Sequence, residues 1–392
     1  MPTFSTTTTG RHNWYKGLDG VRGFAVTVVF LQHYAAMLVL NNGGLIGVQI
    51  FFVLSGFLIT GILFDSRHDS FRFRNFYIRR TLRIFPLFYF SWALILIAGL
   101  FLHLQWKPYH FLWVAYLGNF TRFLVGNLNC DHIYTAYPRL PIEMGHYWSL
   151  AIEEQFYLLW PTVVFFVSNR RILIRICLIA CVTIPLLRAL LFFTLPQHLL
   201  ALDFLFRVTF TNCDGFLLGG LLALWFRGSE QERLLLSSNW LLFPAIALFA
   251  ILQLYFSGWH IKEISFGRAW LSIYGLSLIN IAAAGMILGS LQPGTFIYRL
   301  TASVPLRVVG RYSYGFYVYH VLLNPLLHNY LWPLSHPAAT KLDRIPQFLS
   351  IGVDYVLILA ISAASYHYLE EPFLRLKDRF TNHRHTLSNE NA

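Results

Sequence analysis

The chain has 392 residues, of which 56% are hydrophobic and only 12% charged, whereas a soluble domain carries about 25% charged residues. This composition excludes an ordinary water-soluble globule. The four cysteines, three of them inside apolar runs, also argue against a disulfide-stapled secreted fold and against a zinc or redox framework.

About ten apolar stretches have the length of roughly 20 residues that crosses a bilayer as a helix. We predict an all-α polytopic membrane protein with a transmembrane domain over 18–374, a tail over 1–17 and a basic tail over 375–392. The apolar stretch 110–125 is short for a crossing and is predicted to be re-entrant or interfacial. No cleavable signal peptide is expected before the first span, because the preceding residues are polar. In chain order, the spans are predicted near 18–40, 44–64, 84–104, 147–167, 172–195, 207–226, 240–257, 268–289, 308–332 and 349–370.

Basic residues predict the orientation of these spans. Lys and Arg exceed Asp and Glu by 30 to 18, and most of them flank the span ends on one side, which the positive-inside rule makes the cytoplasmic side. We therefore expect both termini to be cytoplasmic and the protein to lie in the cytoplasmic membrane. Because these residues sit on short loops between lipid-embedded helices, nucleic-acid binding is a poor interpretation of the charge.

The first predicted span contains Arg22 and His33 in LDGVRGFAVTVVFLQHY. A separation of eleven residues is about three helical turns, so both side chains project from one face, about 16 Å apart along the axis. Imidazole is well matched to general-base work near neutral pH. The structural alternatives are a histidine hydrogen-bonded between helices and an arginine that reaches toward the interface.

A second constellation lies in HYWSLAIEEQFYLLWP, which begins at His146. Counted inward from the outer surface, Glu153 falls at nearly the depth of His33, so we predict that the carboxylate orients this imidazole and stabilises its charged form. Glu154 points about 100° away and is expected to be structural. The alternative for Glu153 is an interhelical ion pair with an arginine.

The third constellation is FRFRNFYIRRTLRIFP at the cytoplasmic mouth of the third span. Arg80 and Arg83 share a helix face at spacing i, i+3, and Arg79 stands at i, i+4 from Arg83. Guanidinium groups bind phosphate as forks, so a cytosolic donor that carries phosphates is a chemical match. The alternative is a purely topological signal with anionic lipid headgroups as partners.

The fourth constellation is GRYSYGFYVYH, with Ser313, Tyr314, Tyr317, Tyr319 and His320. These hydroxyl groups and the imidazole are expected either to line a polar passage or to form interhelical hydrogen bonds worth roughly 1 kcal/mol each.

Other polar residues receive no functional role. Ser55 lacks the strand-to-helix context of a nucleophile elbow and is expected to allow close helix packing. Cys177 and Cys181 share a helix face but have no further ligands, so no metal site is predicted. Solvated loop positions are expected for the outer-side histidines His110, His132, His146, His260 and His336.

Taken in order, the motifs resemble those of the acyltransferase 3 family of multi-pass membrane O-acyltransferases. The resemblance covers nearly the whole chain. The segments that carry it are LDGVRGFAVTVVFLQH, GVQIFFVLSGFLIT, FYIRRTLRIFP, YWSLAIEEQFYLLWP, CDGFLLGGLLAL, GRYSYGFYVYH and SYHYLEEPF.

The resemblance implies transfer of an acyl group, most often acetyl, from acyl-coenzyme A to a hydroxyl of a glycan or similar acceptor, with no permanently bound cofactor. It marks Arg22 and His33 of the first span as functional. It assigns an Arg-Arg-x-x-Arg pattern to Arg79, Arg80 and Arg83, and a Trp-Ser-Leu-x-x-Glu pattern to Trp148, Ser149 and Glu153. Gln49 stands where many members carry an acidic residue, and no SGNH-type extension is expected after the membrane domain.

Both lines of reasoning favour one mechanism. Acyl-coenzyme A would bind at the arginines, and His33 would remove a proton from an acceptor hydroxyl that enters from the outer side; a route through an acyl-enzyme stays open. Two other classes also remain open: a proton-coupled carrier of an acyl group or polar solute, with His33 and Glu153 as its relay, and a catalytically silent scaffold.

Overall fold

The computed structural model describes residues 16–35, 43–137, 140–167, 169–201, 203–229, 231–257, 269–327 and 344–380, most of them helical. Helix is the expected outcome, because within a bilayer a helix satisfies its backbone polar groups internally. The helices are α1 Lys16–Ala35, α2 Gly44–Asp65, α3 Arg72–Leu102, α4 Phe111–Val114, α5 Thr121–Val125, α6 Tyr147–Phe166, α7 Arg170–Thr194, α8 Gln197–Ala201, α9 Phe204–Arg207, α10 Cys213–Phe226, α11 Gln231–Leu236, α12 Ser238–Ser257, α13 Leu276–Ser290, α14 Phe296–Thr301, α15 Val304–Arg311, α16 Ser313–Leu326, α17 Arg344–Ser365 and α18 Glu371–Phe380.

Shorter elements complete the described chain. A π-helical turn over Leu271–Gly275 leads into α13, and another over Tyr366–Glu370 joins α17 to α18. Strands β1 His132–Ile133 and β2 Ile142–Glu143 pair antiparallel, with His132 opposite Glu143. Single 3-10 turns lie at Pro108–His110, Gly118–Phe120, Leu128–Asp131 and Thr209–Thr211.

The all-α membrane fold is confirmed. Among the described residues, 6 helical segments are long and apolar enough to cross a membrane: Gly44–Asp65, Arg72–Leu102, Arg170–Thr194, Ser238–Phe256, Leu271–Ser290 and Phe348–Leu376. The other predicted spans fall on α1, α6, α10 and the pair α15 and α16, which carry ionisable side chains or are shorter. The total of about ten spans stays a prediction.

Two predicted spans differ from the observed helices. The third begins at Arg72 and not near residue 84, so the arginine cluster is part of α3. Arginine is a good helix former, and the helix continues through Pro86. The span predicted at 308–332 is instead two helices, α15 and α16, that meet at Tyr312, and its end lies outside the described residues.

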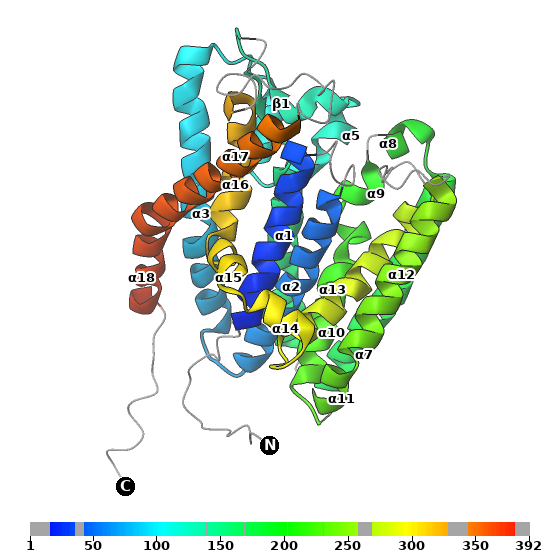
Figure 1. Cartoon of the computed structure of the whole chain (residues 1–392). Coiled ribbons are helices and arrows are strands. Elements are labelled where there is room, and N and C mark those ends of the chain that lie inside the picture. The colour runs from blue at the N-terminus through cyan, green and yellow to red at the C-terminus, as the bar shows by residue number, and fades with distance from the viewer. Residues whose placement is uncertain are drawn as a thin grey trace, which may run out of the picture.

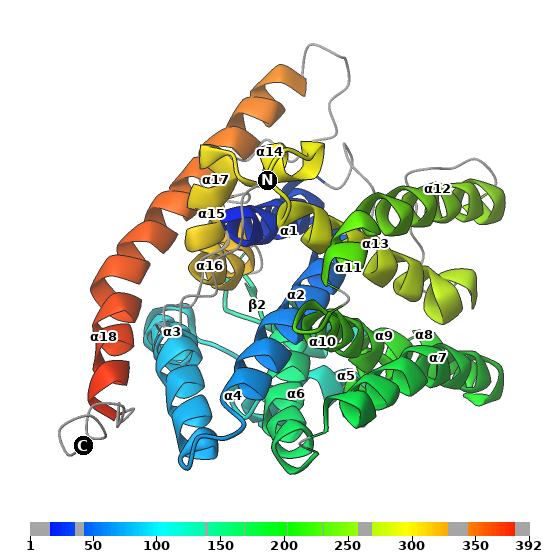
Figure 2. The same ribbon diagram turned by 90° about the horizontal axis from the view of Figure 1, so that it is seen from below.

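The helices form a bundle with two distinct ends (Figure 1). We call the end where α1 and α3 begin and α2 ends the arginine end, and the opposite end, which holds residues 103–137 and 140–146, the loop end. The predicted re-entrant stretch 110–125 lies at the loop end as the short helices α4 and α5 joined by a 3-10 turn. Seen from the arginine end, α17 and α18 run along one edge of the bundle, α7 and α12 lie at the other, and α2 lies inside (Figure 2).

Burial follows this arrangement. The most apolar window of α2 is 72% buried, whereas those of α7 and α12 are 17% buried. The outer helices expose large apolar side chains, including Phe193, Trp240 and Val356. Such a surface would be a liability in water and suits contact with lipid.

Close backbone contact fixes α1 in the bundle. A Cβ atom at Gly20 would lie 1.6 Å from the carbonyl oxygen of Thr301, and one at Gly23 would lie 2.0 Å from that of Leu306. Only glycine allows this approach, which is the usual device for tight packing of membrane helices. Helix α1 is therefore held backbone to backbone against α14 and α15.

Candidate active site

A cavity of about 460 Å³ opens among α1, α2, α3, α6 and α16, and we call it the arginine cavity. Its lining includes the carboxylates Asp69 and Glu153 and a larger number of cations, the side chains of Arg22, Arg72, Arg79, Arg80 and Arg83. The excess of guanidinium groups makes the cavity suited to a ligand with several negative charges.

The arginines are held by several neighbours. Arg22 forms an ion pair with Asp19, one turn earlier on α1, at 3.0 Å. The guanidinium of Arg80 lies 4.3 Å from the centre of the Tyr157 ring, which is a cation–π contact. Arg83 lies on the same face of α3 as Arg80. Its guanidinium interacts electrostatically with the carboxylate of Glu370. Glu370 comes from the π-helical turn, so the end of the chain also shapes this site.

Glu153 belongs to the arginine cavity, where its carboxylate accepts a hydrogen bond of 2.8 Å from the Ser55 hydroxyl. The predicted pairing of Glu153 with His33 is wrong in this structure, because the two side chains line different cavities. Ser55, which received no role from the sequence, is the residue that positions this carboxylate. Glu154 does not line either of these cavities.

His33 lines a second cavity of about 350 Å³ toward the loop end, which we call the histidine cavity. The Nδ1–H of His33 donates to the backbone oxygen of Val29 at 3.0 Å. In the neutral ring this bond leaves Nε2 as the unprotonated nitrogen, the form that a general base requires. Three carboxylates line this cavity together with His33: Glu143 of β2, Asp131 and Asp203.

Two further imidazoles pack beside His33. The ring of His320 lies 5.0 Å from that of His33 and 5.5 Å from that of His146. His320 Nδ1 donates to the Tyr317 backbone oxygen at 2.7 Å, which leaves His320 Nε2 buried without a partner. Across the described residues, no group of three or more His, Cys, Asp or Glu side chains is arranged to hold a metal ion.

Ion pairs build the outer wall of the histidine cavity. Asp131 accepts from Arg122 at 2.8 Å and from Arg207 at 2.6 Å, and Arg122 also pairs with Asp203. These bonds tie the loop end to the segment that follows α7, so the cavity has a fixed frame although its wall is not a long helix.

The paired strands add a titratable contact to this wall. His132 Nε2 lies 3.7 Å from Glu143 Oε1 across the ladder, and this neighbouring carboxylate raises the pKa of His132 above its ordinary value. The expectation that the outer-side histidines are solvated is wrong for His110 and His146, which are 1% and 5% exposed. His260 and His336 lie outside the described residues.

Most predicted site residues gather around these two cavities. Arg22, the three arginines of α3, Ser149, Glu153, Ser313 and Tyr314 line the arginine cavity. His33 and Trp148 line the histidine cavity. His320 lines neither of the two but touches the His33 ring.

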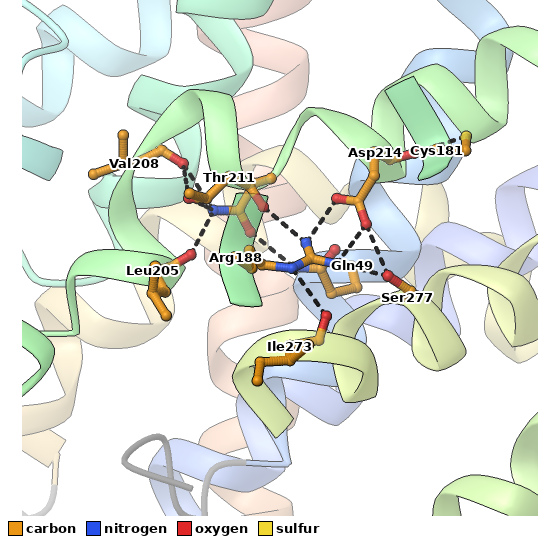
Figure 3. Close-up of polar contacts among 10 residues, drawn as sticks. Gln49, Cys181, Arg188, Leu205, Val208, Thr211, Asp214, Ile273 and Ser277 are labelled. Carbon is orange, nitrogen blue, oxygen red and sulfur yellow. Dashed lines mark hydrogen bonds and ion pairs between the residues drawn. The ribbon is translucent and has the colours of Figure 1, made fainter. Parts of the chain in front are cut away.

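A buried ion pair lies apart from both cavities (Figure 3). The Arg188 guanidinium makes five hydrogen bonds: two to the Asp214 carboxylate at 2.8 and 2.9 Å, and one each to Ser277 Oγ and to the backbone oxygens of Thr211 and Ile273. The pair joins α7, α10 and α13. Gln49 donates nearby to Asn212 at 3.3 Å and lines neither cavity, so the absence of an acid at this position does not alter the candidate site.

Comparison with known proteins identifies the family of the chain. The family model described as an acyltransferase domain, Acyl_transf_3, matches residues 15–367. The chain belongs to the acyltransferase 3 family. No solved structure matches the chain.

Relatives of this acyltransferase 3 chain are bacterial. It is 26% identical over 374 residues to the O-acetyltransferase OatA of Staphylococcus aureus, a match that covers 91% of this chain and 56% of the relative. It is 29% identical over 389 residues to the putative peptidoglycan O-acetyltransferase YrhL of Bacillus subtilis, with 93% of this chain and 55% of the relative covered. It is also 29% identical to the peptidoglycan O-acetyltransferase OatA of Listeria monocytogenes, with 80% and 50% covered. This acyltransferase 3 chain thus spans about half the length of the curated relatives it matches.

Proposed function

We propose that the chain is a membrane O-acetyltransferase that moves an acetyl group from cytosolic acetyl-coenzyme A to a hydroxyl of a cell-envelope glycan, with peptidoglycan as the first acceptor to test. One observation carries the proposal: a cavity rich in arginine and a cavity with an available imidazole nitrogen adjoin each other, and both are lined by Val48 and Tyr317. The names of the relatives support acetyl transfer and the glycan acceptor.

The donor would bind at the arginine end, which we place on the cytoplasmic side together with both termini. The phosphates of coenzyme A match the guanidinium groups of Arg79, Arg80 and Arg83, and Arg22 lines the same cavity. The pantetheine arm would carry the thioester along the arginine cavity toward Tyr317.

The acceptor would enter from the loop end. His33 Nε2 would take the hydroxyl proton while the acceptor oxygen bonds to the thioester carbonyl carbon. The carbon–sulfur bond then breaks, and the coenzyme A sulfur takes the proton back from His33, so the imidazole is regenerated. Trp148 gives the histidine cavity an aromatic face against which a sugar ring can pack.

The test uses purified protein in liposomes, supplied with acetyl-labelled acetyl-coenzyme A and peptidoglycan glycan strands. We expect label to appear on the glycan in an alkali-labile ester, and free coenzyme A to form in equal amount. Uptake of label into the vesicle lumen without esterified glycan would support the carrier class. No label in either place, with protein shown to be folded, would contradict the proposal.

Removing two arginines from the donor site is expected to weaken donor binding. In the double variant Arg80→Ala with Arg83→Ala, the KM for acetyl-coenzyme A should rise about 10²- to 10⁴-fold, since each of the two lost hydrogen bonds to a charged group contributes about 1.5–3 kcal/mol. The kcat should change less, because neither guanidinium reaches the histidine cavity. Initial rates over a range of donor concentrations measure both constants.

Arg74 provides the control for this change. It lies on the same helix and donates to the Phe380 backbone oxygen at 2.9 Å but does not line the arginine cavity. Arg74→Ala should leave the KM near its wild-type value. Equal KM values for Arg74→Ala and for the double variant would assign the arginines of α3 to membrane topology alone.

A further inference from the structure

The two cavities meet at a single aromatic side chain. Val48 of α2 and Tyr317 of α16 are the residues that line both of them. The arginines of α3 line only one side of this boundary, and His33 lines only the other. Under the proposed function, a thioester that arrives with the arginines must therefore pass Tyr317 to reach the imidazole nitrogen.

Tyr317 is held in this place by polar contacts at its tip. Its hydroxyl donates to the backbone oxygen of His146 at 2.8 Å and lies 2.5 Å from the Ser149 hydroxyl. The ring is buried and lies 5.6 Å from that of His146 and 5.4 Å from that of His320. Both tip contacts come from the start of α6, and a side chain held by hydrogen bonds can rotate once these are exchanged for others.

Position and attachment together indicate a role for this residue. We propose that the Tyr317 side chain is the partition between donor and acceptor cavities: seated, it keeps water of the loop end away from the thioester, and displaced, it admits the thioester to His33. Exclusion of water matters to this chemistry, because water competes with the acceptor hydroxyl for an activated acyl group. Tyr317 is thus a positioning residue that sets the ratio of transfer to hydrolysis, and this role rests on the proposed function.

The first experiment measures that ratio in liposomes with acetyl-coenzyme A, with and without glycan. In Tyr317→Ala, hydrolysis of acetyl-coenzyme A relative to acetyl transfer should rise at least about tenfold, since the water-excluding side chain is gone. Tyr317→Phe, which keeps the ring but loses the tip contacts, should show a smaller rise.

Tyr319 supplies the matched control. It lies on the same helix, is equally buried and donates to Ser365 Oγ at 3.0 Å, but it does not line either of the two cavities. Tyr319→Ala removes the same volume and should leave the ratio unchanged. Equal ratios for Tyr317→Ala and Tyr319→Ala would overturn the partition.

The second experiment needs no enzymatic activity. In a chain whose four cysteines are replaced by alanine, Ser55→Cys places one thiol in the arginine cavity, and Gln32→Cys places one in the histidine cavity. A membrane-impermeant sulfonated thiol reagent, added only on the loop-end side of sealed vesicles, should modify Gln32→Cys but not Ser55→Cys. Adding Tyr317→Ala should expose Ser55→Cys to the reagent.

The two experiments separate the two claims. Protection of Ser55→Cys that is lost on Tyr317→Ala, in a protein without acetyl transfer, would uphold the partition and reject the proposed function. Equal modification of Ser55→Cys with and without Tyr317→Ala would reject the partition even if transfer occurs. Should Tyr317→Ala not reach the membrane, Tyr317→Val, which removes the ring but leaves a small apolar side chain, replaces it in both experiments.

Discussion

Replacing His33 with alanine is expected to lower acetyl transfer by about 10²- to 10⁴-fold, the range that a positioned general base contributes. The reason is geometric: the bond from Nδ1 to the Val29 oxygen holds the ring with Nε2 available to a hydroxyl in the histidine cavity. Donor binding should persist, because the arginine cavity does not include this residue. Label transfer at saturating donor measures kcat, and equilibrium binding of acetyl-coenzyme A measures the donor site.

His110→Ala serves as the control for loss of a buried imidazole. His110 is 1% exposed and lines neither of the two cavities, so its removal should change stability more than kcat. A His33→Ala protein that retains the wild-type kcat would exclude this imidazole as the base. Loss of donor binding together with kcat would instead indicate that the substitution disturbs the bundle.

Asp214→Ala is expected to destabilise the protein by about 3–5 kcal/mol, the usual cost of leaving one charge of a buried pair without its partner. Arg188 is fully buried, and two of its five hydrogen bonds end on this carboxylate (Figure 3). Without Asp214, the guanidinium would keep Ser277 and two backbone oxygens as partners but no counter-charge. Thermal unfolding of the detergent-purified protein measures the loss.

A double replacement tests whether the charge is the cause. Arg188→Met with Asp214→Val removes both charges and fills much of the volume, so it should recover a large part of the lost stability, as apolar replacements of buried ion pairs often do. If the double variant is less stable than Asp214→Ala, the network contributes through the geometry of its hydrogen bonds and not through charge balance.

The membrane class was predictable because composition and stretch length report it directly. The placement of Arg22 and His33 also followed from helix geometry, since eleven residues span three turns and bring the two side chains to different depths of one face. In the structure these depths correspond to two cavities. The same reasoning failed for Glu153, because depth along a helix does not specify which neighbour lies across from it. Ser55 of α2 occupies that position.

The loop end was the least predictable part. Its fold depends on ion pairs between residues far apart in the chain, such as Arg122 with Asp203 and Asp131 with Arg207, and no periodic pattern records them. From the sequence alone, a buried histidine in such a segment cannot be distinguished from a solvent-exposed histidine. For His146, the one signal in the sequence was its position two residues before Trp148 and three before Ser149.

The glycine contacts of α1 bear on how a reaction cycle can proceed. With the backbone at Gly20 and Gly23 packed closely against carbonyl oxygens of α14 and α15, this helix has little room to slide or rotate against those two helices. The imidazole of His33 on α1 therefore keeps its position, and both substrates must bind next to it. In solute carriers, by contrast, one group of helices moves against the other so that the binding site opens to each side of the membrane in turn. The contacts of α1 therefore suit a reaction in which His33 keeps one position relative to α14 and α15.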